Sequence, residues 1–151
     1  STPAAGVRIA DAWPRHALTM PIDYRISSDG DLVLAVASGV DFTVDDVKAY
    51  GMAVITACLK SGATRVLCDE RQLMGQLDTL GDYEAAEFVA QHATRVVRVA
   101  IVCPAHLLGD RDFWETVAVN RGLRVRVFAD IDLANTWLAE TTSPMPATIT
   151  G

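Results

Sequence analysis

The stretch VLCDERQLMGQLDTLGDYEAAEFV, residues 66–89, decides the fold, because it joins an apolar strand, a polar loop and a helix in that order. Residues 64–70, TRVLCDE, are apolar in the middle, which is typical of a short buried strand. The helix is predicted to begin at Thr79, whose hydroxyl can cap a free amide while Asp82, three residues on, reaches back. The stretch therefore predicts a strand, a loop and a helix, and it leaves open whether the junction at Thr79 also carries a switch.

Upstream of this stretch the pattern predicts a β-hairpin and a first helix. Residues 22–27, IDYRIS, alternate apolar and polar side chains, and the mostly apolar run LVLAVASG, 32–39, follows after the turn SDGD. Thr43 can cap the helix that follows, with Asp46 completing a capping box. The dipeptide SG at 61–62 is the predicted end of that helix.

Downstream the chain alternates strand and helix twice more. The run VVRVAIVC, 96–103, is nearly all apolar, as expected for a central strand covered on both faces. Asp110 is the predicted cap of the next helix, and Gly122 stands where a left-handed residue often ends one. Residues 123–128, LRVRVF, alternate as an outer strand does, and Asp130 is the predicted cap of the last helix.

The order of these elements predicts an α/β fold: an opening β-hairpin, then a mostly parallel sheet of about five strands with four helices. We expect one domain over 20–140, which Met20 opens immediately before the first strand. Residues 1–19 lack the continuous apolar segment of a signal peptide and are predicted to be a loose leader, and the Thr- and Pro-rich 141–151 to be a tail.

Composition narrows the classes of function. Carboxylates outnumber Lys and Arg by 19 to 13, for a net charge of −6, and the Arg residues are scattered among Asp and Glu, so no basic patch for nucleic acid is predicted. The three cysteines have no metal-type spacing, and we expect neither a metal nor a cofactor. No apolar run approaches the ~20 residues that cross a bilayer, so no transmembrane segment is expected and a cytoplasmic location is favoured.

The loop and helix start also match a known motif. Asp69 ends the strand as an acid, and Asp78, Thr79 and Gly81 fall on the D, first S and G of a DSSG pattern. In these residues, and in IVCPAHL and NRGLRVRVFADIDLANTWL, the chain resembles the STAS superfamily, most closely its SpoIIAA-like branch of STAS/SEC14 domains, over roughly 22–139. The resemblance implies the STAS-like sandwich of bacterial anti-sigma-factor antagonists, in which the first Ser of the motif is the phosphorylation site. The chain departs from that pattern, since Thr79 replaces the first Ser and Leu80 the second.

A non-enzymatic binding role near Thr79 is the leading hypothesis, and an enzymatic role is left open. The occupant would be a protein partner or a small apolar ligand of the kind that the SEC14 name suggests. Thr79 is the candidate for phosphorylation, although a plain helix cap would also select Thr there, and Asp78 and Asp82 would oppose an added phosphate. The candidate contact set is Asp69, Asp78, Thr79, Leu80, Gly81 and Tyr83.

Two alternatives use other residues. Cys68 and Cys103 end strands that are predicted neighbours, so with His106 they could form a redox or catalytic site, although buried free cysteines are common in cores. A homodimeric structural module is the third hypothesis, with exposed aromatic residues as its possible contact surface.

Overall fold

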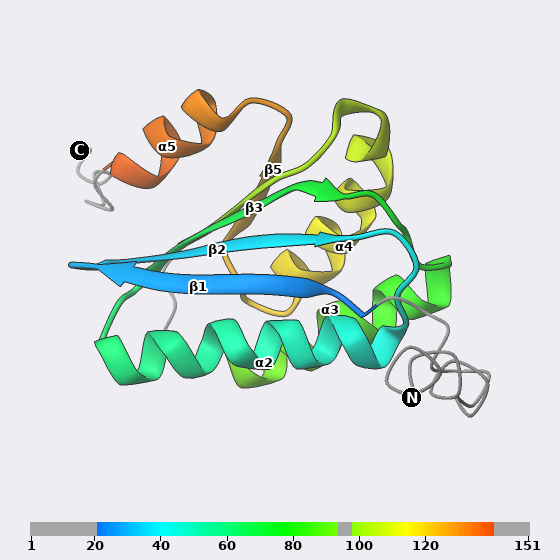
Figure 1. Ribbon diagram of the computed structural model, residues 1–151, viewed down its shortest axis with the longest axis horizontal. Helices are drawn as coiled ribbons and strands as arrows, with labels where there is room; N and C mark the ends of the chain where they lie inside the picture. Colours follow the sequence, from blue (N-terminus) through cyan, green and yellow to red (C-terminus); the bar gives the residue numbers. More distant parts are fainter. Residues whose placement is uncertain (1–20, 94–97, 141–151) are drawn as a thin grey trace, which may run out of the picture.

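The computed structural model describes residues 21–93 and 98–140, which form a five-stranded sheet flanked by helices (Figure 1). The sheet order is the chain order, with the first two strands antiparallel and every later pair parallel. The strands are β1 (Asp23–Asp29), β2 (Leu32–Gly39), β3 (Arg65–Leu73), β4 (Arg98–Val102) and β5 (Val125–Phe128). The predicted α/β fold with an opening hairpin is confirmed.

Four α-helices and one 3₁₀ turn lie in the described residues. They are α2 (Val44–Ser61), α3 (Thr79–His92), η2 (Ala105–Leu107), α4 (Leu108–Asn120) and α5 (Ile131–Ala139). Each parallel connection crosses over through a helix, as parallel pairing requires. None of the helices in this part of the chain is long and apolar enough to cross a membrane.

The helices cover the two faces of the sheet unequally. Helices α2, α3 and α4 pack on one face, and α5 lies on the other (Figure 1). Strand β2 shows the consequence, because Val33 and Ala35 point into the larger core under α2 while Leu32 and Leu34 pack into the smaller core under α5. The part of the second face that α5 does not cover is formed by β1 and the ends of β2 and β3.

Two predicted helix starts are confirmed by cap geometry. The Thr43 hydroxyl accepts a hydrogen bond from the Asp46 amide at 3.2 Å, and the Asp46 carboxylate accepts one from the Thr43 amide at 2.8 Å. Asp130 caps α5 by accepting from the amide of Asp132 at 2.8 Å. Gly122 follows the end of α4 with a φ of 95°, the left-handed backbone that glycine tolerates best.

Two other predicted caps are wrong. Asp78 caps α3 instead of Thr79, because its carboxylate, one residue earlier, accepts the Gly81 amide at 2.7 Å. Asp110 does not cap α4, because that helix continues from η2 and already begins at Leu108. The predicted leader 1–19 and tail 141–151 lie outside the described residues.

Candidate functional site

The loops that follow β2 and β3 meet at the carboxyl end of the sheet. The Met74 amide donates to the Gly39 carbonyl at 2.8 Å, which ties the two loops together. A Cβ on Gly75 would lie 2.6 Å from the Phe42 ring and 2.7 Å from the Val40 carbonyl oxygen, closer than real Cβ contacts come. Glycine at position 75 is therefore required by the close approach of the two loops.

The N-terminus of α3 stands beside these loops. A Cβ on Gly81 would lie 3.0 Å from the Asp78 carboxylate and 3.0 Å from a methyl group of Val44, so the glycine permits α3 to pack closely against the start of α2. Thr79 is exposed in the first turn, and its hydroxyl forms no hydrogen bond with any residue in the two described segments. The Thr79 side chain is exposed to solvent among the described residues.

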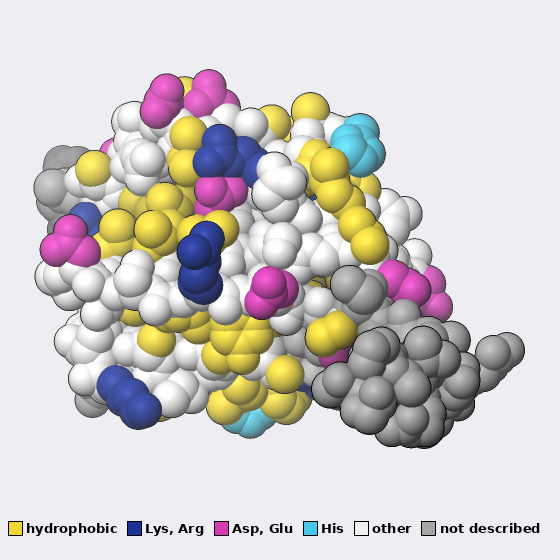
Figure 2. Space-filling view, viewed as in Figure 1, with side chains coloured by type: hydrophobic (Ala, Val, Ile, Leu, Met, Phe, Trp, Pro, Cys, Tyr) yellow, Lys and Arg dark blue, Asp and Glu magenta, His cyan; other side chains and the backbone are white. Residues whose placement is uncertain are grey.

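Large apolar side chains are exposed at this end of the sheet. Leu80 is 73% exposed, Val40 62% and Met74 45%, and they lie on α3, on the β2–α2 loop and on the β3–α3 loop. Figure 2 shows hydrophobic side chains at the surface on the right-hand side of the molecule, where Figure 1 places the ends of β2 and β3. We call Val40, Met74 and Leu80 the loop-end apolar surface.

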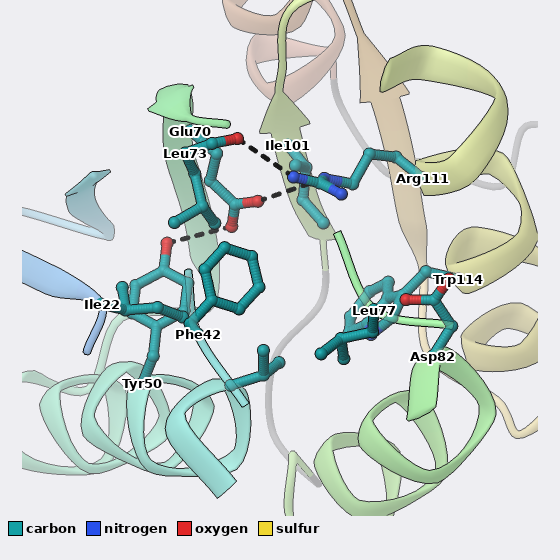
Figure 3. Close-up of a pocket in the computed structure, with 11 residues that line it drawn as sticks. Ile22, Phe42, Tyr50, Glu70, Leu73, Leu77, Asp82, Ile101, Arg111 and Trp114 are labelled. Carbon is teal, nitrogen blue, oxygen red and sulfur yellow. Dashed lines mark hydrogen bonds and ion pairs between the residues drawn. The ribbon is translucent and has the colours of Figure 1, made fainter. Parts of the chain in front are cut away.

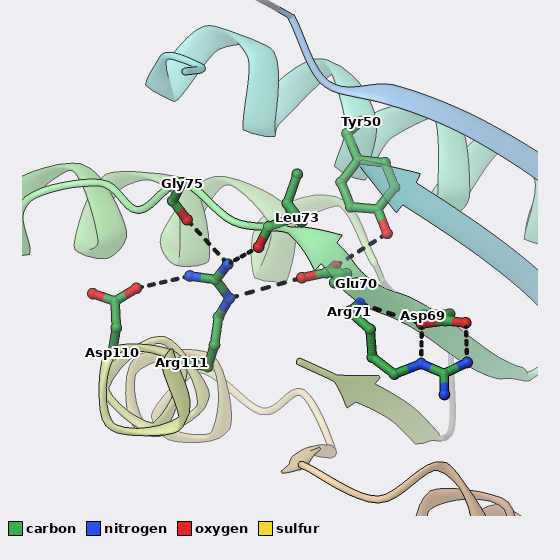
Figure 4. A network of polar contacts seen from close by, with 8 residues as sticks. All are labelled: Tyr50, Asp69, Glu70, Arg71, Leu73, Gly75, Asp110 and Arg111. Carbon is green, nitrogen blue, oxygen red and sulfur yellow. Dashed lines mark hydrogen bonds and ion pairs between the residues drawn. The ribbon is translucent and has the colours of Figure 1, made fainter. Parts of the chain in front are cut away.

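A buried polar network lies directly beneath the loops (Figure 4). The Tyr50 hydroxyl of α2 donates to Glu70 of β3 at 3.0 Å, and the Glu70 carboxylate lies 3.9 Å from the guanidinium of Arg111 on α4. Glu70 is 7% exposed and Arg111 8%. Burial raises the pKa of Glu70, while the Arg111 charge and the Tyr50 hydrogen bond act against that rise. The network thus joins two helices through the central strand.

Arg111 also holds the β3–α3 loop in place. Its guanidinium donates to the carbonyl oxygens of Leu73 and Gly75, at 3.2 Å each, and to the carboxylate of Asp110 at 2.9 Å. A planar guanidinium can donate several bonds at once in a fixed geometry, which suits it to fastening an irregular segment of backbone. The path of the loop toward α3 therefore depends on one buried side chain of α4.

Asp82 joins α3 to the same network. It is 5% exposed, and its pKa is raised to about 7 by burial, then by a hydrogen bond with Asp110 and by the negative charges of Asp110 and Asp78, against the positive charge of Arg111. Two carboxyl groups in contact cannot both ionise cheaply, so Asp82 keeps its proton to a higher pH than a free aspartate does. Sequence reasoning assigned Asp82 to the helix cap; the structure places it inside the protein instead.

A small cavity lies between this network and the apolar core (Figure 3). It has a volume of about 60 Å³ and is lined by Phe42, Leu73 and Trp114 beside the polar groups of Tyr50, Glu70 and Arg111. A second void of about 70 Å³ adjoins it and has an almost wholly apolar lining. Each is smaller than the 150 Å³ cavity that holds one benzene molecule in an engineered lysozyme core.

The positions of Cys68 and Cys103 do not match those of a reactive pair. Cys68 faces the core under α2 and stands in register with Ile101 of β4, so Cys103, beyond the end of β4, is not its cross-strand neighbour. Burial raises the pKa of both thiols, that of Cys103 to about 11, whereas a reactive cysteine needs a lowered pKa. His106 is exposed on η2. No group of metal-ligating side chains occurs in the described residues.

Asp69 and Tyr83 lie apart from the loops. Asp69 forms two hydrogen bonds with the Arg71 guanidinium, at 2.9 and 2.7 Å, and these bonds lower its pKa. Asp69 and Glu70 point to opposite faces of the sheet, so the Asp69 side chain lies on the face that carries α5.

Tyr83 of α3 contacts α4. The Tyr83 hydroxyl accepts a hydrogen bond from Arg121 of α4 at 2.5 Å, and Arg121 also pairs with Glu87 at 3.2 Å. Of the predicted set, Asp78, Thr79 and Leu80 are therefore exposed together at the start of α3, Gly81 is buried beside them, and Tyr83 lies one turn further along the helix.

The comparison with protein families agrees with this architecture. A family model described as SpoIIAA-like matches residues 33–139. The chain belongs to the SpoIIAA-like family. The resemblance to the STAS superfamily, predicted from the DSSG-like stretch, is thereby confirmed. No curated protein matches this SpoIIAA-like chain.

Two solved structures share the fold of this SpoIIAA-like protein. One is an anti-sigma factor antagonist from Mycobacterium paratuberculosis, with a TM-score of 0.56 and 14% identity over 82% of this chain and 100% of that one. The other is an uncharacterised protein with a SpoIIAA-like fold from Shewanella loihica PV-4, with a TM-score of 0.51 and 20% identity over 79% of this chain and 94% of that one. At such identities the likeness establishes the fold alone.

Sequence reasoning missed the network beneath the site of this SpoIIAA-like chain. A signal was present, because Arg111 shares a helix face with Trp114 and Ala118, three and seven residues later, and both of these pack into the core. Glu70 has a similar signal, since it alternates with the buried Val66 and Cys68 on one face of β3. Charged residues on a core face predict a buried ion pair.

Proposed function

We propose that this SpoIIAA-like domain is a non-enzymatic binding module that engages a protein partner through the loop-end apolar surface and the N-terminus of α3. The observation that carries the proposal is the exposure of Leu80, 73%, in the first turn of a helix that Asp78 caps and whose preceding loop is held by Arg111. Exposed apolar side chains on a segment that hydrogen bonds hold in place are suited to a protein interface.

The interior argues for a protein partner over an enclosed ligand. Sites for small molecules usually have volumes of about 300–1,000 Å³. The two voids beneath the loops have volumes of about 60 and 70 Å³. A lipid of the kind that the SEC14 name suggests could enter these two voids only by opening the core, whereas a partner that covers Leu80 requires no such change.

Thr79 stands as the candidate point of control on this surface. A phosphate on its exposed hydroxyl would lie at the positive end of α3 and would add about two negative charges between Asp78 and the surface of the partner. We propose that modification at Thr79 alters partner binding. Asp78 already occupies the Gly81 amide, at 2.7 Å, so that amide is not available to a phosphate.

Affinity capture with matched variants tests the proposal. We expect the wild-type chain, used as bait in extract from its own host, to retain a partner that Leu80→Asp loses by roughly tenfold or more, since hot-spot residues contribute ≥2 kcal/mol. Leu133→Asp is the control, because Leu133 is 59% exposed in the first turn of α5, far along the chain from the loops. Equal loss with both variants, or retention by Leu80→Asp, contradicts the proposal.

A further inference from the structure

Strand β1 has an open edge in the part of the chain that the structure describes. It pairs only with β2 and is seven residues long, whereas β5 at the opposite edge has four. A long exposed edge is a template for another strand unless proline, a bulge or charge blocks it. Residues Asp23–Asp29 contain no proline, and their register with β2 is continuous. Only the charges on β1 then decide which strand can pair there.

The hairpin turn fixes which backbone groups face the open edge. A two-residue turn joins β1 to β2 between Asp29 and Leu32, and residues that flank such a turn form a hydrogen-bonded pair. Backbone groups alternate in direction along an antiparallel strand. Tyr24, Ile26 and Ser28 therefore direct their amides and carbonyls away from β2, toward the open edge.

Two opposite charges on β1 have no partner within the described residues. Ile26 packs toward the core under α2, so Arg25 and Asp29 project from the other face of the sheet, and both are exposed. Neither makes an ion pair or a side-chain hydrogen bond with another residue of 21–93 or 98–140. They cannot pair with each other, because four residues along a strand span about 13 Å.

We propose that two copies of this chain associate by antiparallel pairing of their β1 edges, with Ser27 opposite Ser27 of the second copy. This register places each Arg25 opposite Asp29 of the other copy, so two Arg25–Asp29 ion pairs form across the interface. Ile26 and Ser28 then form the hydrogen-bonded pairs across the two-fold axis, with the backbone groups that the hairpin leaves directed outward. The two sheets join into one continuous sheet.

Two neighbouring symmetric registers are disfavoured by charge. Placing Ile26 opposite Ile26 brings Asp23 opposite Asp29 of the second copy, and placing Arg25 opposite Arg25 brings two cations together. Like charges directly opposite each other destabilise a strand pair, whereas opposite charges stabilise it. Placing Ser28 opposite Ser28 limits the paired residues to 27–29 and leaves Arg25 without Asp29 of the other copy. Charge and the length of the paired segment together therefore favour one register.

The surface differs from the loop-end apolar surface, so this inference does not depend on the proposed function. Among the described elements, β1 contacts β2 and α2, while Leu80 lies on α3. A single pair of short strands buries less than the roughly 1,200 Å² of a stable interface, so the dimer is weak and depends on protein concentration. Salt weakens it further, because the Arg25–Asp29 pairs are exposed.

Cross-linking tests the register directly. Opposite residues in a non-hydrogen-bonded pair have Cα atoms about 4.5 Å apart, within the range of a disulfide. We expect the full chain with Ser27→Cys to form a disulfide-linked dimer on mild oxidation, since the three native cysteines are buried. Asp23→Cys is the control, because the proposed register separates the two copies of residue 23 by about 26 Å. Equal cross-linking of both variants, or none with Ser27→Cys, overturns the proposal.

Exchanging the charges on β1 tests the proposed dimer without cross-linking. In sedimentation equilibrium, we expect Arg25→Asp and Asp29→Arg each to weaken association by roughly tenfold, and the double variant to restore it, because the pairs are exchanged and not removed. Thermal unfolding checks that all variants fold, which we expect since both side chains are exposed and unpaired among the described residues. A monomer at every concentration, or a dimer that is indifferent to all three changes, overturns the proposal.

Discussion

The two ends of the sheet use carboxylates in opposite ways. At the amino end of β3, Asp31 accepts hydrogen bonds from the hydroxyl and the amide of Thr64, each at 2.8 Å, and lies 3.7 Å from Arg65; these contacts lower its pKa. At the carboxyl end, Asp82 is buried against Asp110, and its pKa rises to about 7. One end is stabilised by an ionised carboxylate, while the other keeps a proton near neutral pH.

This difference indicates that the Asp31 cluster has a structural role, whereas the buried network supports the proposed binding surface. The Asp31 cluster fastens a turn at the surface, where hydrogen bonds to an ionised group are readily formed. The network of Glu70, Asp82 and Arg111 is buried, where ionised groups are costly unless they are fully paired. It lies directly beneath the loop that leads to Leu80, so we interpret it as the support of the binding surface.

The largest expected effect on stability comes from replacing Arg111, the buried cation at the carboxyl end of the sheet. We expect Arg111→Met to lower the free energy of unfolding by roughly 3–5 kcal/mol, because Glu70 and Asp110 lose their buried partner and the loop carbonyls lose their donor. Arg121→Met is the control, since Arg121 is exposed and pairs at the surface, where we expect about 1 kcal/mol or less. Urea unfolding at pH 7 measures both. Similar losses in the two variants would remove the distinction between the ends.

The next effect is a dependence on pH. The folded protein binds a proton at Asp82 that the unfolded chain releases near pH 4, so the contribution of Asp82 to stability falls as the pH rises from about 4 to about 7. We expect Asp82→Asn, which keeps a hydrogen-bond donor toward Asp110, to abolish this fall and to gain on the order of 3 kcal/mol at pH 8. Urea unfolding from pH 4 to pH 8 measures the two slopes, and parallel slopes would contradict the assignment.

The cap at the start of α3 gives an intermediate effect. Asp78→Ala should lower the free energy of unfolding by about 1 kcal/mol, because the Gly81 amide loses its acceptor. Thr79→Ala should change it by less than about 0.5 kcal/mol, as is usual for exposed surface positions. Thermal unfolding compares the two variants, and the reverse order would restore Thr79 as the cap.

The smallest effect on the free energy of unfolding is expected at Asp31, at the amino end of the sheet. Its dependence on pH is opposite to that of Asp82. Because the pKa of Asp31 is lowered, its contribution is present at neutral pH and is lost as the pH falls below about 4. Asp31→Asn should lower the free energy of unfolding at pH 7 by less than about 1 kcal/mol, since the site is exposed to solvent. The same pH series as for Asp82→Asn measures it, and equal signs in the two variants would contradict the contrast.

The sequence predicted the fold because hydrophobic periodicity and caps act locally. The capping box of Thr43 and Asp46 and the left-handed Gly122 are features that neighbouring residues determine. The support of the site was not predicted, because Glu70 and Arg111 are 41 positions apart and meet only when β3 and α4 pack together. A local pattern shows that each charge lies on a core face; only the fold shows which charges pair.

Hydrogen–deuterium exchange of the chain with and without the partner captured by the wild type tests the central claim most directly. We predict that the partner slows exchange in residues 74–83, which contain the β3–α3 loop and the start of α3, and leaves α5 unchanged. Slower exchange on α5 or on β1 alone, with residues 74–83 unaffected, would contradict the placement of the binding surface at the carboxyl end of the sheet.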